Sequence, residues 1–332
     1  MILSLLIACQ NDNDQAVDPE TAAILAVKDY TAGQLDGLAG AALAIQAAAP
    51  SPDADGWGAG ETADVEASWS DARNAYERVE GAIAVLFPDL DASTDERYDG
   101  FIAEGPDEDL FDGEGVIGVH AIERIVWADR HPDYVVAFES ALPFYTPAAF
   151  PASEAEAAAF RDELCQRLVD DTATMASEFA PLALDSAAAF RGVIGSMAEQ
   201  YEKVALASTG EDESRYAQHT LADMRANLEG GEEVFGAFDA WLEATEGGEA
   251  VHDEIHAGFE RVAAGYAAVS GDAIPTVPET WNPDAPSEAD LATDYGKLWA
   301  MLSTEADPTI EGSLVARMGA AADLLGIPQI PE

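Results

Sequence analysis

The chain has few cysteines and no long apolar run, and each shortage excludes a class of structure. Cys9 and Cys165 are the only cysteines in 332 residues, so no disulfide framework is expected. No segment offers the about 18 uninterrupted apolar residues that a membrane-spanning helix needs. The sequence therefore predicts neither a disulfide-stabilised domain nor a transmembrane helix.

Basic residues are also scarce, at 15 against 64 acidic residues, and only three of them are lysines. The formal net charge of −49 repels phosphate backbones, which excludes nucleic-acid binding through a basic patch. Disorder is not expected, because 48% of the residues are apolar and the acidic residues are interleaved with helical periodicities. An acidic, lysine-poor, alanine-rich surface indicates adaptation to high salt, where self-repulsion is screened.

Residues 1–16 have the composition of a lipoprotein signal and tether. Leu6-Ile7-Ala8-Cys9 ends a short apolar run and matches the pattern that is cleaved before a lipid-modified cysteine in prokaryotic lipoproteins. No Lys or Arg precedes the run, which leaves a frayed apolar N-terminus as the alternative. We expect Cys9 to carry a lipid that anchors the protein to a membrane, in the periplasm or at the cell surface.

Beyond residue 16, nearly every segment has helical periodicity, and Pro, Gly or Asp residues separate the segments. This pattern predicts an all-α fold of two packed halves, each resembling a four-helix bundle. The predicted helices cover 20–48, 61–87, 114–128, 153–179, 184–208, 213–245, 248–270, 287–304 and 308–325.

A connection with four prolines, 129–153, divides the predicted halves. We expect a first helical bundle at 17–149 that holds a metal site, and a second bundle at 150–332. The pattern Asp-x-Arg-x-x-x-Glu occurs at residues 71–77 and again at 223–229, which suggests an internal duplication. Three matched charges can also arise by chance in so acidic a chain.

The segment GVHAIERIVW, residues 118–127, carries the first candidate ligands. In a helix Glu123 falls within an apolar stripe, and His120 lies one turn before it on the same side. A carboxylate in a core costs several kcal/mol unless its charge is compensated. A cation bound by His120 and Glu123 would compensate it, and so would an arginine paired with Glu123.

A second pair of candidate ligands, Glu77 and Glu80, flanks the apolar stripe of the predicted helix at 61–87. Carboxylates one turn apart can converge on one cation. Arg73 lies four residues before Glu77, so a simple ion pair on the surface is the alternative. The Asp- and Gly-rich segment 87–113 follows, and it has no EF-hand spacing.

These segments resemble the imelysin-like family, especially its EfeO/EfeM-type branch of iron-uptake components. The resemblance covers most of residues 20–328 and includes YERVEG, TDER, GVHAIERIVWAD, RYAQHTLADMRANLEG and DLLGI. It implies a metal site in the first bundle, with the ligands Glu77, Glu80, Asp95, His120 and Glu123. Gly81 and Gln218 depart from the branch, which usually has proline and often has histidine at these positions.

The resemblance covers the helical module only, and the cupredoxin-like domain of longer members is not expected. It implies an iron-capturing protein of the cell envelope, with an iron permease and a haem peroxidase-like protein as partners. One imidazole and up to four carboxylates suit iron, and zinc or manganese could compete. We expect no enzyme activity.

Two other functions compete with iron capture. A zinc-dependent imelysin-type peptidase would need His-x-x-Glu-His, but Arg124 stands where the second histidine belongs. His252 and His256 have zincin spacing, but Asp253 replaces the general base, and we interpret this pair as an exposed coincidence. A metal-dependent polysaccharide-binding protein is the third possibility, and the net charge of −49 opposes it for polyanions unless cations bridge the two.

Overall fold

The computed structural model of the chain describes residues 17–50, 57–58 and 60–330, and within these ranges it is helical and contains no strand. Cys9 and the tether lie outside the described residues. The helices of the first half are α1 (Pro19–Ala48), α2 (Ala63–Glu77), α3 (Glu80–Leu86), α4 (Pro88–Asp95), α5 (Tyr98–Glu104), α6 (Gly118–Val126) and α7 (Asp133–Glu139). The predicted all-α fold is confirmed.

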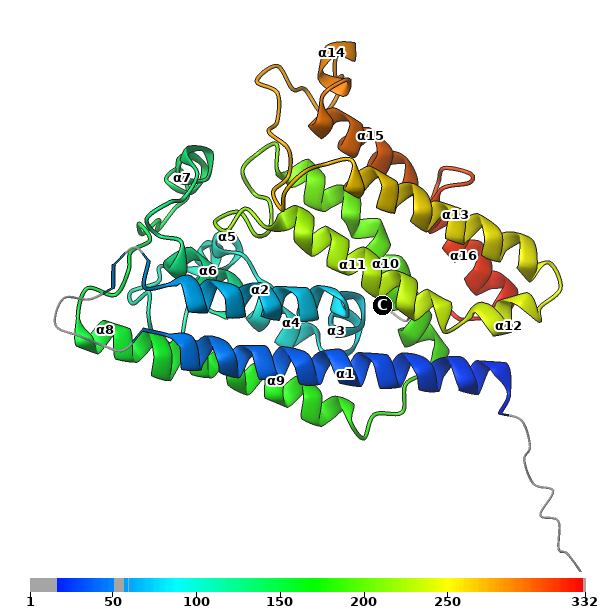
Figure 1. The fold of residues 1–332 in the computed structure, drawn as a ribbon, viewed down its shortest axis with the longest axis horizontal. Helices are drawn as coiled ribbons and strands as arrows, with labels where there is room; N and C mark the ends of the chain where they lie inside the picture. The colour runs from blue at the N-terminus through cyan, green and yellow to red at the C-terminus, as the bar shows by residue number, and fades with distance from the viewer. Residues whose placement is uncertain (1–16, 51–56, 59, 331–332) are drawn as a thin grey trace, which may run out of the picture.

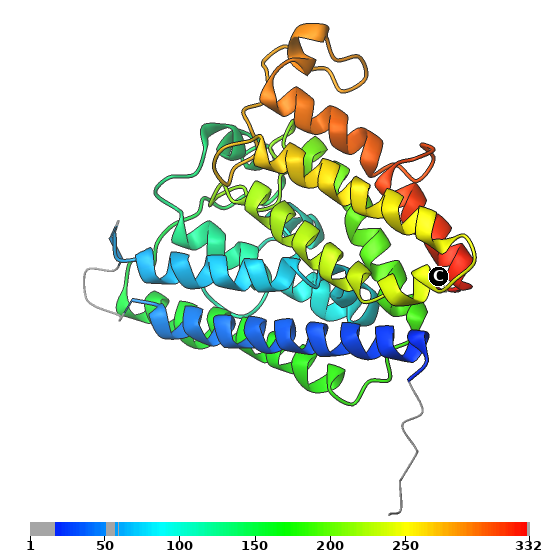
Figure 2. The ribbon, with the colours of Figure 1, turned by 45° about the vertical axis from the view of Figure 1, so that its right-hand side comes forward.

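The helices that follow belong to the rest of the chain. They are α8 (Glu154–Ala159), the π-helical turn η1 (Phe160–Leu164), α9 (Cys165–Phe179), α10 (Ser186–Leu206), α11 (Thr220–Gly236), α12 (Asp239–Glu243), α13 (Gly248–Ala267), α14 (Glu288–Leu291), α15 (Asp294–Glu305) and α16 (Leu314–Leu325). Figures 1 and 2 show α1 alongside α2 and α9, with α10, α11 and α13 fanning out above α1.

The helix α1 runs along both halves because its buried face extends over its whole length. Asp18 caps its N-terminus, where its carboxylate accepts a 3.0 Å hydrogen bond from the Thr21 N–H. Its buried residues recur every three or four positions, which gives one continuous stripe: Ala23, Val27, Thr31, Leu35, Leu38, Ala42 and Ile45. Ala23 and Val27 pack in the core of the second half, whereas the stripe from Leu35 onwards packs in the core of the first.

Two apolar cores underlie the two halves. The first gathers side chains from α1, α2, α6 and α9, and the second gathers them from α10, α11, α13, α15 and α16. Residues 157–179 therefore pack with the first half, although the predicted boundary at 149 assigns them to the second. We retain two helical domains as a proposal and place α8 and α9 with the first by packing.

The backbones of α3 and α10 come into direct contact between the halves. A Cβ at Gly81 would lie only 2.4 Å from the carbonyl oxygen of Gly192, so any side chain at Gly81 would push the helices apart. Gly81, which stands where the EfeO/EfeM-type branch usually has proline, thus permits this close approach of the two halves.

The predicted helix at 61–87 is interrupted between α2 and α3. The carbonyl oxygen of Glu77 accepts a 3.0 Å hydrogen bond from the Asn227 side chain. The carbonyl of Arg78 lies against Gly230, where a Cβ would approach it to 2.1 Å. Contacts with α11, which sequence periodicity does not reveal, accompany the break. As a result, the side chains of Glu77 and Glu80 both turn towards the second half.

Other predicted helices are shorter than expected. The segment 213–219 lacks helical structure, and Gln218 has a left-handed φ of 57°. The Pro-rich connection contains α7, which the sequence did not predict. Among the described residues, none of the helices combines the length and apolarity needed to cross a bilayer.

The suggested duplication is not confirmed, because matched residues occupy different environments. Arg73 is fully buried among carboxylates, whereas Arg225 donates hydrogen bonds to backbone carbonyls of 266–271. Glu77 is buried, whereas Glu229 is exposed and pairs with Arg78.

Candidate metal centre

The position of His120 depends on the glycine that begins α6. Gly118 has a left-handed φ of 81°, and a Cβ there would lie 2.4 Å from the carbonyl oxygen of Thr94. Only glycine therefore allows the start of α6 to contact the end of α4. This contact brings His120 next to Asp95, whose Oδ1 lies 3.3 Å from Nε2 of His120.

The imidazole of His120 is held by Glu123 and leaves one ring nitrogen available. Nδ1 lies 2.8 Å from Oε2 of Glu123, and we assign Nδ1–H as the donor because the carboxylate can only accept. Nε2 then carries a lone pair. Among the described residues Nε2 has no hydrogen-bond partner, although the His120 side chain is only 1% exposed.

Hydrogen bonds compensate the Glu123 carboxylate, and no arginine among the described residues forms an ion pair with it. Its Oε1 accepts from the backbone N–H groups of Tyr216 at 2.8 Å and Ala217 at 2.7 Å, and its Oε2 contacts His120. Burial raises the pKa of Glu123, and the hydrogen bond from His120 opposes this rise. Both carboxylate oxygens are thus engaged, so the geometry favours Glu123 as the residue that orients His120.

Three carboxylates and one arginine surround the position next to His120. Arg73 is fully buried and forms ion pairs with Asp95, Glu77 and Glu213, the last at 3.3 Å. Ligand atoms of Asp95, His120 and Glu213 lie within 4.8 Å of one another. So do carboxylate oxygens of Glu77, Glu80, Asp95 and Glu213, which makes the two groups a single cluster linked by Asp95 and Glu213.

Lys203, from α10, provides the second positive charge of this cluster. Its Nζ lies 3.1 Å from Glu77, 3.0 Å from Glu80 and 2.7 Å from Glu213. Burial acts to lower the pKa of Lys203, but these carboxylates outweigh it and raise the pKa well above the ordinary value. The ammonium group therefore stays charged and holds three carboxylates together.

Asn227, from α11, makes further polar contacts with two of the glutamates that bind Lys203. Its amide donates to carboxylate oxygens of Glu77 and Glu80, the latter at 2.7 Å. Its carbonyl oxygen accepts from Ser196 at 2.6 Å and from Gln200 at 2.8 Å. This chain of hydrogen bonds fixes the two glutamates from the side of the second half.

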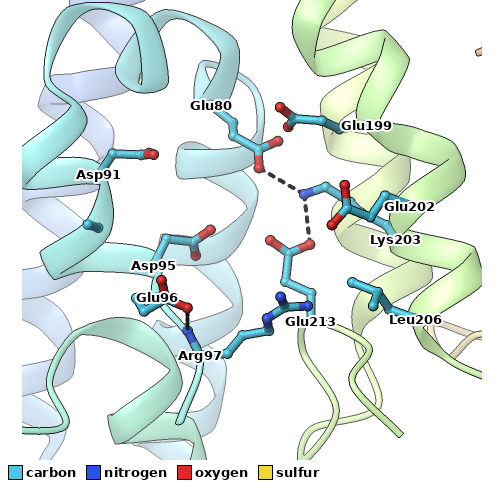
Figure 3. A pocket seen from close by; sticks show the side chains of 11 residues that line it. Glu80, Asp91, Asp95, Glu96, Arg97, Glu199, Glu202, Lys203, Leu206 and Glu213 are labelled. Atoms are coloured by element: carbon cyan, nitrogen blue, oxygen red, sulfur yellow. Dashed lines mark hydrogen bonds and ion pairs between the residues drawn. The ribbon is translucent and has the colours of Figure 1, made fainter. Parts of the chain in front are cut away.

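The cluster opens into a cleft between the halves, of about 450 Å³, shown in Figure 3. Seven of its eleven lining residues are acidic and two are basic: Glu80, Asp91, Ala92, Asp95, Glu96, Arg97, Glu199, Glu202, Lys203, Leu206 and Glu213. In Figure 3, Glu80 and Glu213 approach the Lys203 amine from opposite sides, and Asp95 faces the same space from α4. A cation from solvent can reach the cluster through this cleft.

Burial raises the pKa values of four carboxyl groups in and around the cluster. It raises the pKa of Asp95 to about 7 against the opposing charge of Arg73, and it raises the pKa of Asp91 to about 7. It also raises the pKa values of Glu77 and Glu80. For Glu213, burial is outweighed by the charges of Lys203 and Arg73, which hold its pKa below the usual range.

The structure brings four of the five predicted ligands into one cluster and places the fifth, Glu123, behind His120. Glu77 is less exposed than Glu80, at 1% against 8%, so Glu77 lies deeper in the core. Sequence reasoning missed Glu213, Lys203 and Asn227. Helical spacing offered one indication that Lys203 is buried, because Lys203 follows Gln200 by three residues on the same face of α10.

The chain is similar in sequence to one protein family and to several named proteins. A sequence model of the Imelysin (Peptidase_M75) family matches residues 27–297. The "Iron uptake system component EfeO" of Yersinia pseudotuberculosis is 28% identical over 185 residues, which cover 56% of this chain and 40% of that protein. The protein of the same name from Escherichia coli K12 is 25% identical over 176 residues, covering 53% and 37%. The matched region thus spans about two fifths of these relatives.

A solved structure shows the same fold. An imelysin-like protein from Psychrobacter arcticum superposes with a TM-score of 0.54 and 14% identity, and the match covers 95% of this chain and 98% of the other.

Proposed function

Since the chain belongs to the imelysin family, we propose that it captures iron in the cell envelope for an iron-uptake system. Its similarity to EfeO proteins, which are named as components of such a system, supports an iron-related role. Iron is the cargo in this proposal and is handed on to a membrane permease.

The buried, unpartnered Nε2 of His120 is the observation that carries this proposal. Among the described residues it has no hydrogen-bond partner, yet it faces Asp95 at 3.3 Å beside an acidic cleft. A metal ion on Nε2 would satisfy it, since Nδ1 is already bound to a carboxylate, as in many metal-ligating histidines. An imidazole with several carboxylate oxygens suits iron, with zinc and manganese as competitors.

We assign ligand roles to Asp95, His120 and Glu213, with Glu80 closest to the cleft and Glu77 deeper. Glu123 orients His120. Asp223 also lies 3.4 Å from Arg73, so five carboxylates surround the two charges of Arg73 and Lys203, and a cation would offset the excess negative charge of their ionised forms. Because Lys203 already neutralises part of the cluster, the metal competes with it, which favours release as well as capture.

The same proposal includes a cellular location and two partner proteins. A lipid on Cys9 would anchor the protein in the periplasm or at the cell surface, and an iron permease and a haem peroxidase-like protein would act as its partners. No enzyme activity is proposed. At the position where an inverted zincin needs its second histidine, Arg124 is buried and pairs with Glu139 at 3.2 Å.

Polysaccharide binding remains a separate candidate that requires bridging cations. Retention on alginate beads with and without a divalent cation distinguishes it from iron capture. Cation-dependent retention that survives loss of His120 would favour polysaccharide binding.

Titration with metal tests the assignment. We expect metal-free protein to bind one Fe²⁺ at this centre under anaerobic conditions, with Zn²⁺ and Mn²⁺ as alternatives. His120→Gln should weaken this binding by more than about 100-fold, and Glu123→Gln by about 10–100-fold, because the second change only releases the imidazole. Glu202→Gln, at the cleft wall, is the matched control. Binding by His120→Gln equal to that of the wild type would contradict the proposal.

Affinity at this centre should also depend on pH. The pKa of Asp95 is raised to about 7 in the metal-free protein, and a metal binds its deprotonated form. Below pH 7 a proton must be displaced, so affinity should fall by about tenfold per pH unit and level off above pH 7. Competition with a chelating dye measures this. Asp95→Asn should flatten the dependence, and a flat profile for the wild type would refute it.

A further inference from the structure

A second group of metal-binding side chains lies in the other half of the molecule, where α12 meets α13. Nε2 of His252 and Nε2 of His256 each lie 3.3 Å from the same oxygen, Oδ1 of Asp239. These three ligand atoms lie within 4.8 Å of one another. The chain has five histidines, and two of them converge here on one carboxylate.

The local backbone builds this arrangement. His252 and His256 are four residues apart on α13, so their rings lie one above the other, with centroids 4.4 Å apart. Gly247 has a left-handed φ of 84°, and a Cβ at Gly248 would lie 1.8 Å from the carbonyl oxygen of Leu242. Glycine at both positions therefore lets α13 begin directly against α12, which presents Asp239 to the two rings.

Neighbouring side chains fix the orientation of the rings. The Phe235 ring packs at 5.3 Å from the ring of His256 and at 6.3 Å from that of His252. Nδ1 of His252 lies 3.3 Å from Oδ1 of Asp253. Both nitrogens of His252 thus face carboxylate oxygens, but a neutral imidazole has only one N–H to donate. A metal ion on Nε2, with Nδ1–H donating to Asp253, satisfies both nitrogens.

We propose that His252, His256 and Asp239 form a second binding site, for a divalent transition metal of the zinc class. Oε1 of Glu243 lies 3.8 Å from Nε2 of His252, but it is not among the ligand atoms that lie within 4.8 Å of one another. Two imidazoles and one carboxylate, with water in the fourth position, match the ligands that zinc takes at sites with an open position. The negative charges of Asp239 and the nearby Glu243 offset that of a divalent ion.

This site differs from the cleft in exposure and in ligand type. The side chains of His252, His256 and Asp239 are 15%, 43% and 36% exposed, so an ion reaches them directly from solvent. Two imidazoles favour Zn²⁺, Cu²⁺ or Ni²⁺, whereas the carboxylate-rich cleft favours iron. The spacing interpreted from the sequence as a coincidence thus has the geometry of a site. The bound ion would cross-link α12 to α13, and Asp253 would orient His252.

Zn²⁺ titration of the full metal-free chain tests the proposal. We expect the double variant His252→Gln/His256→Gln to bind one Zn²⁺ fewer than the wild type, and Asp239→Asn to bind this ion at least about tenfold more weakly. Glu249→Gln, exposed on the same helix, is the matched control and should bind as the wild type does. Co²⁺ should give the visible absorption of a tetrahedral site in the wild type and in His120→Gln, but not in the double variant.

Circular dichroism of each variant without metal checks that the fold is intact. If the double variant does not fold, Asp239→Asn alone decides. An intact variant that binds as many Zn²⁺ ions as the wild type, with equal affinity, would overturn the proposal. His120→Gln leaves the site at His252 and His256 in place. A failure of this second-site proposal can therefore be distinguished from a failure of iron capture in the cleft.

Discussion

Replacing Lys203 with methionine should destabilise the metal-free protein by about 3–5 kcal/mol, and added metal should restore most of this loss. The substitution removes the ammonium group that contacts Glu77, Glu80 and Glu213, and it leaves buried negative charges uncompensated. A divalent ion can take over this compensation. Affinity for Zn²⁺ at the cleft should therefore rise in Lys203→Met, because the competing cation is gone.

Thermal melts with and without Zn²⁺ measure both effects. Lys297→Met is the matched control, since Lys297 is exposed and pairs only with Asp294 among the described residues. Its stability should change by less than about 0.5 kcal/mol. Equal stability of Lys203→Met and the wild type, with the same metal affinity, would show that Lys203 does not stand in for a cation.

The second large effect is expected from salt. At a net charge of −49 the folded chain repels itself, and screening shortens the Debye length from about 30 Å at 0.01 M to about 3 Å at 1 M. We expect loss of helical structure in dilute buffer and its recovery in molar salt, with a melting temperature that rises by at least about 10 °C. Circular dichroism across this range is the measurement.

Two salts separate screening from specific ion effects. Sodium chloride and choline chloride should stabilise to a similar degree at equal ionic strength, because screening does not depend on the identity of the cation. A melting temperature independent of salt would refute the adaptation to high salt.

Periodicity predicted helices such as α1, which buries a single face, whereas α6 is buried on all sides. It placed α1 within a residue of its observed start, but it joined α2 to α3. The break there accompanies contacts with Asn227 and Gly230, which lie about 150 residues away in the chain. No local pattern encodes such contacts, and the same holds for the non-helical segment 213–219.

The residues of the candidate site likewise include some that the sequence could predict and some that it could not. His120 and Glu123 could be paired from the sequence because helical spacing fixes their relation, and the resemblance added Glu77, Glu80 and Asp95. Glu213 could not be found, because it lies in a loop whose path depends on how the halves pack. The sequence does not reveal that the backbone N–H groups of residues 216–217 donate hydrogen bonds to the Glu123 carboxylate. For this reason Glu123 was predicted to be a ligand.

The central claim is that one metal ion binds between the halves on Nε2 of His120. Anomalous diffraction from crystals of the protein loaded anaerobically with iron locates the ion directly. The account predicts a peak in contact with Nε2 of His120 and with carboxylate oxygens of Asp95 and Glu213, on the side of the cleft lined by Glu80. A fully loaded crystal in which the iron lies elsewhere and His120 has no metal contact would contradict it.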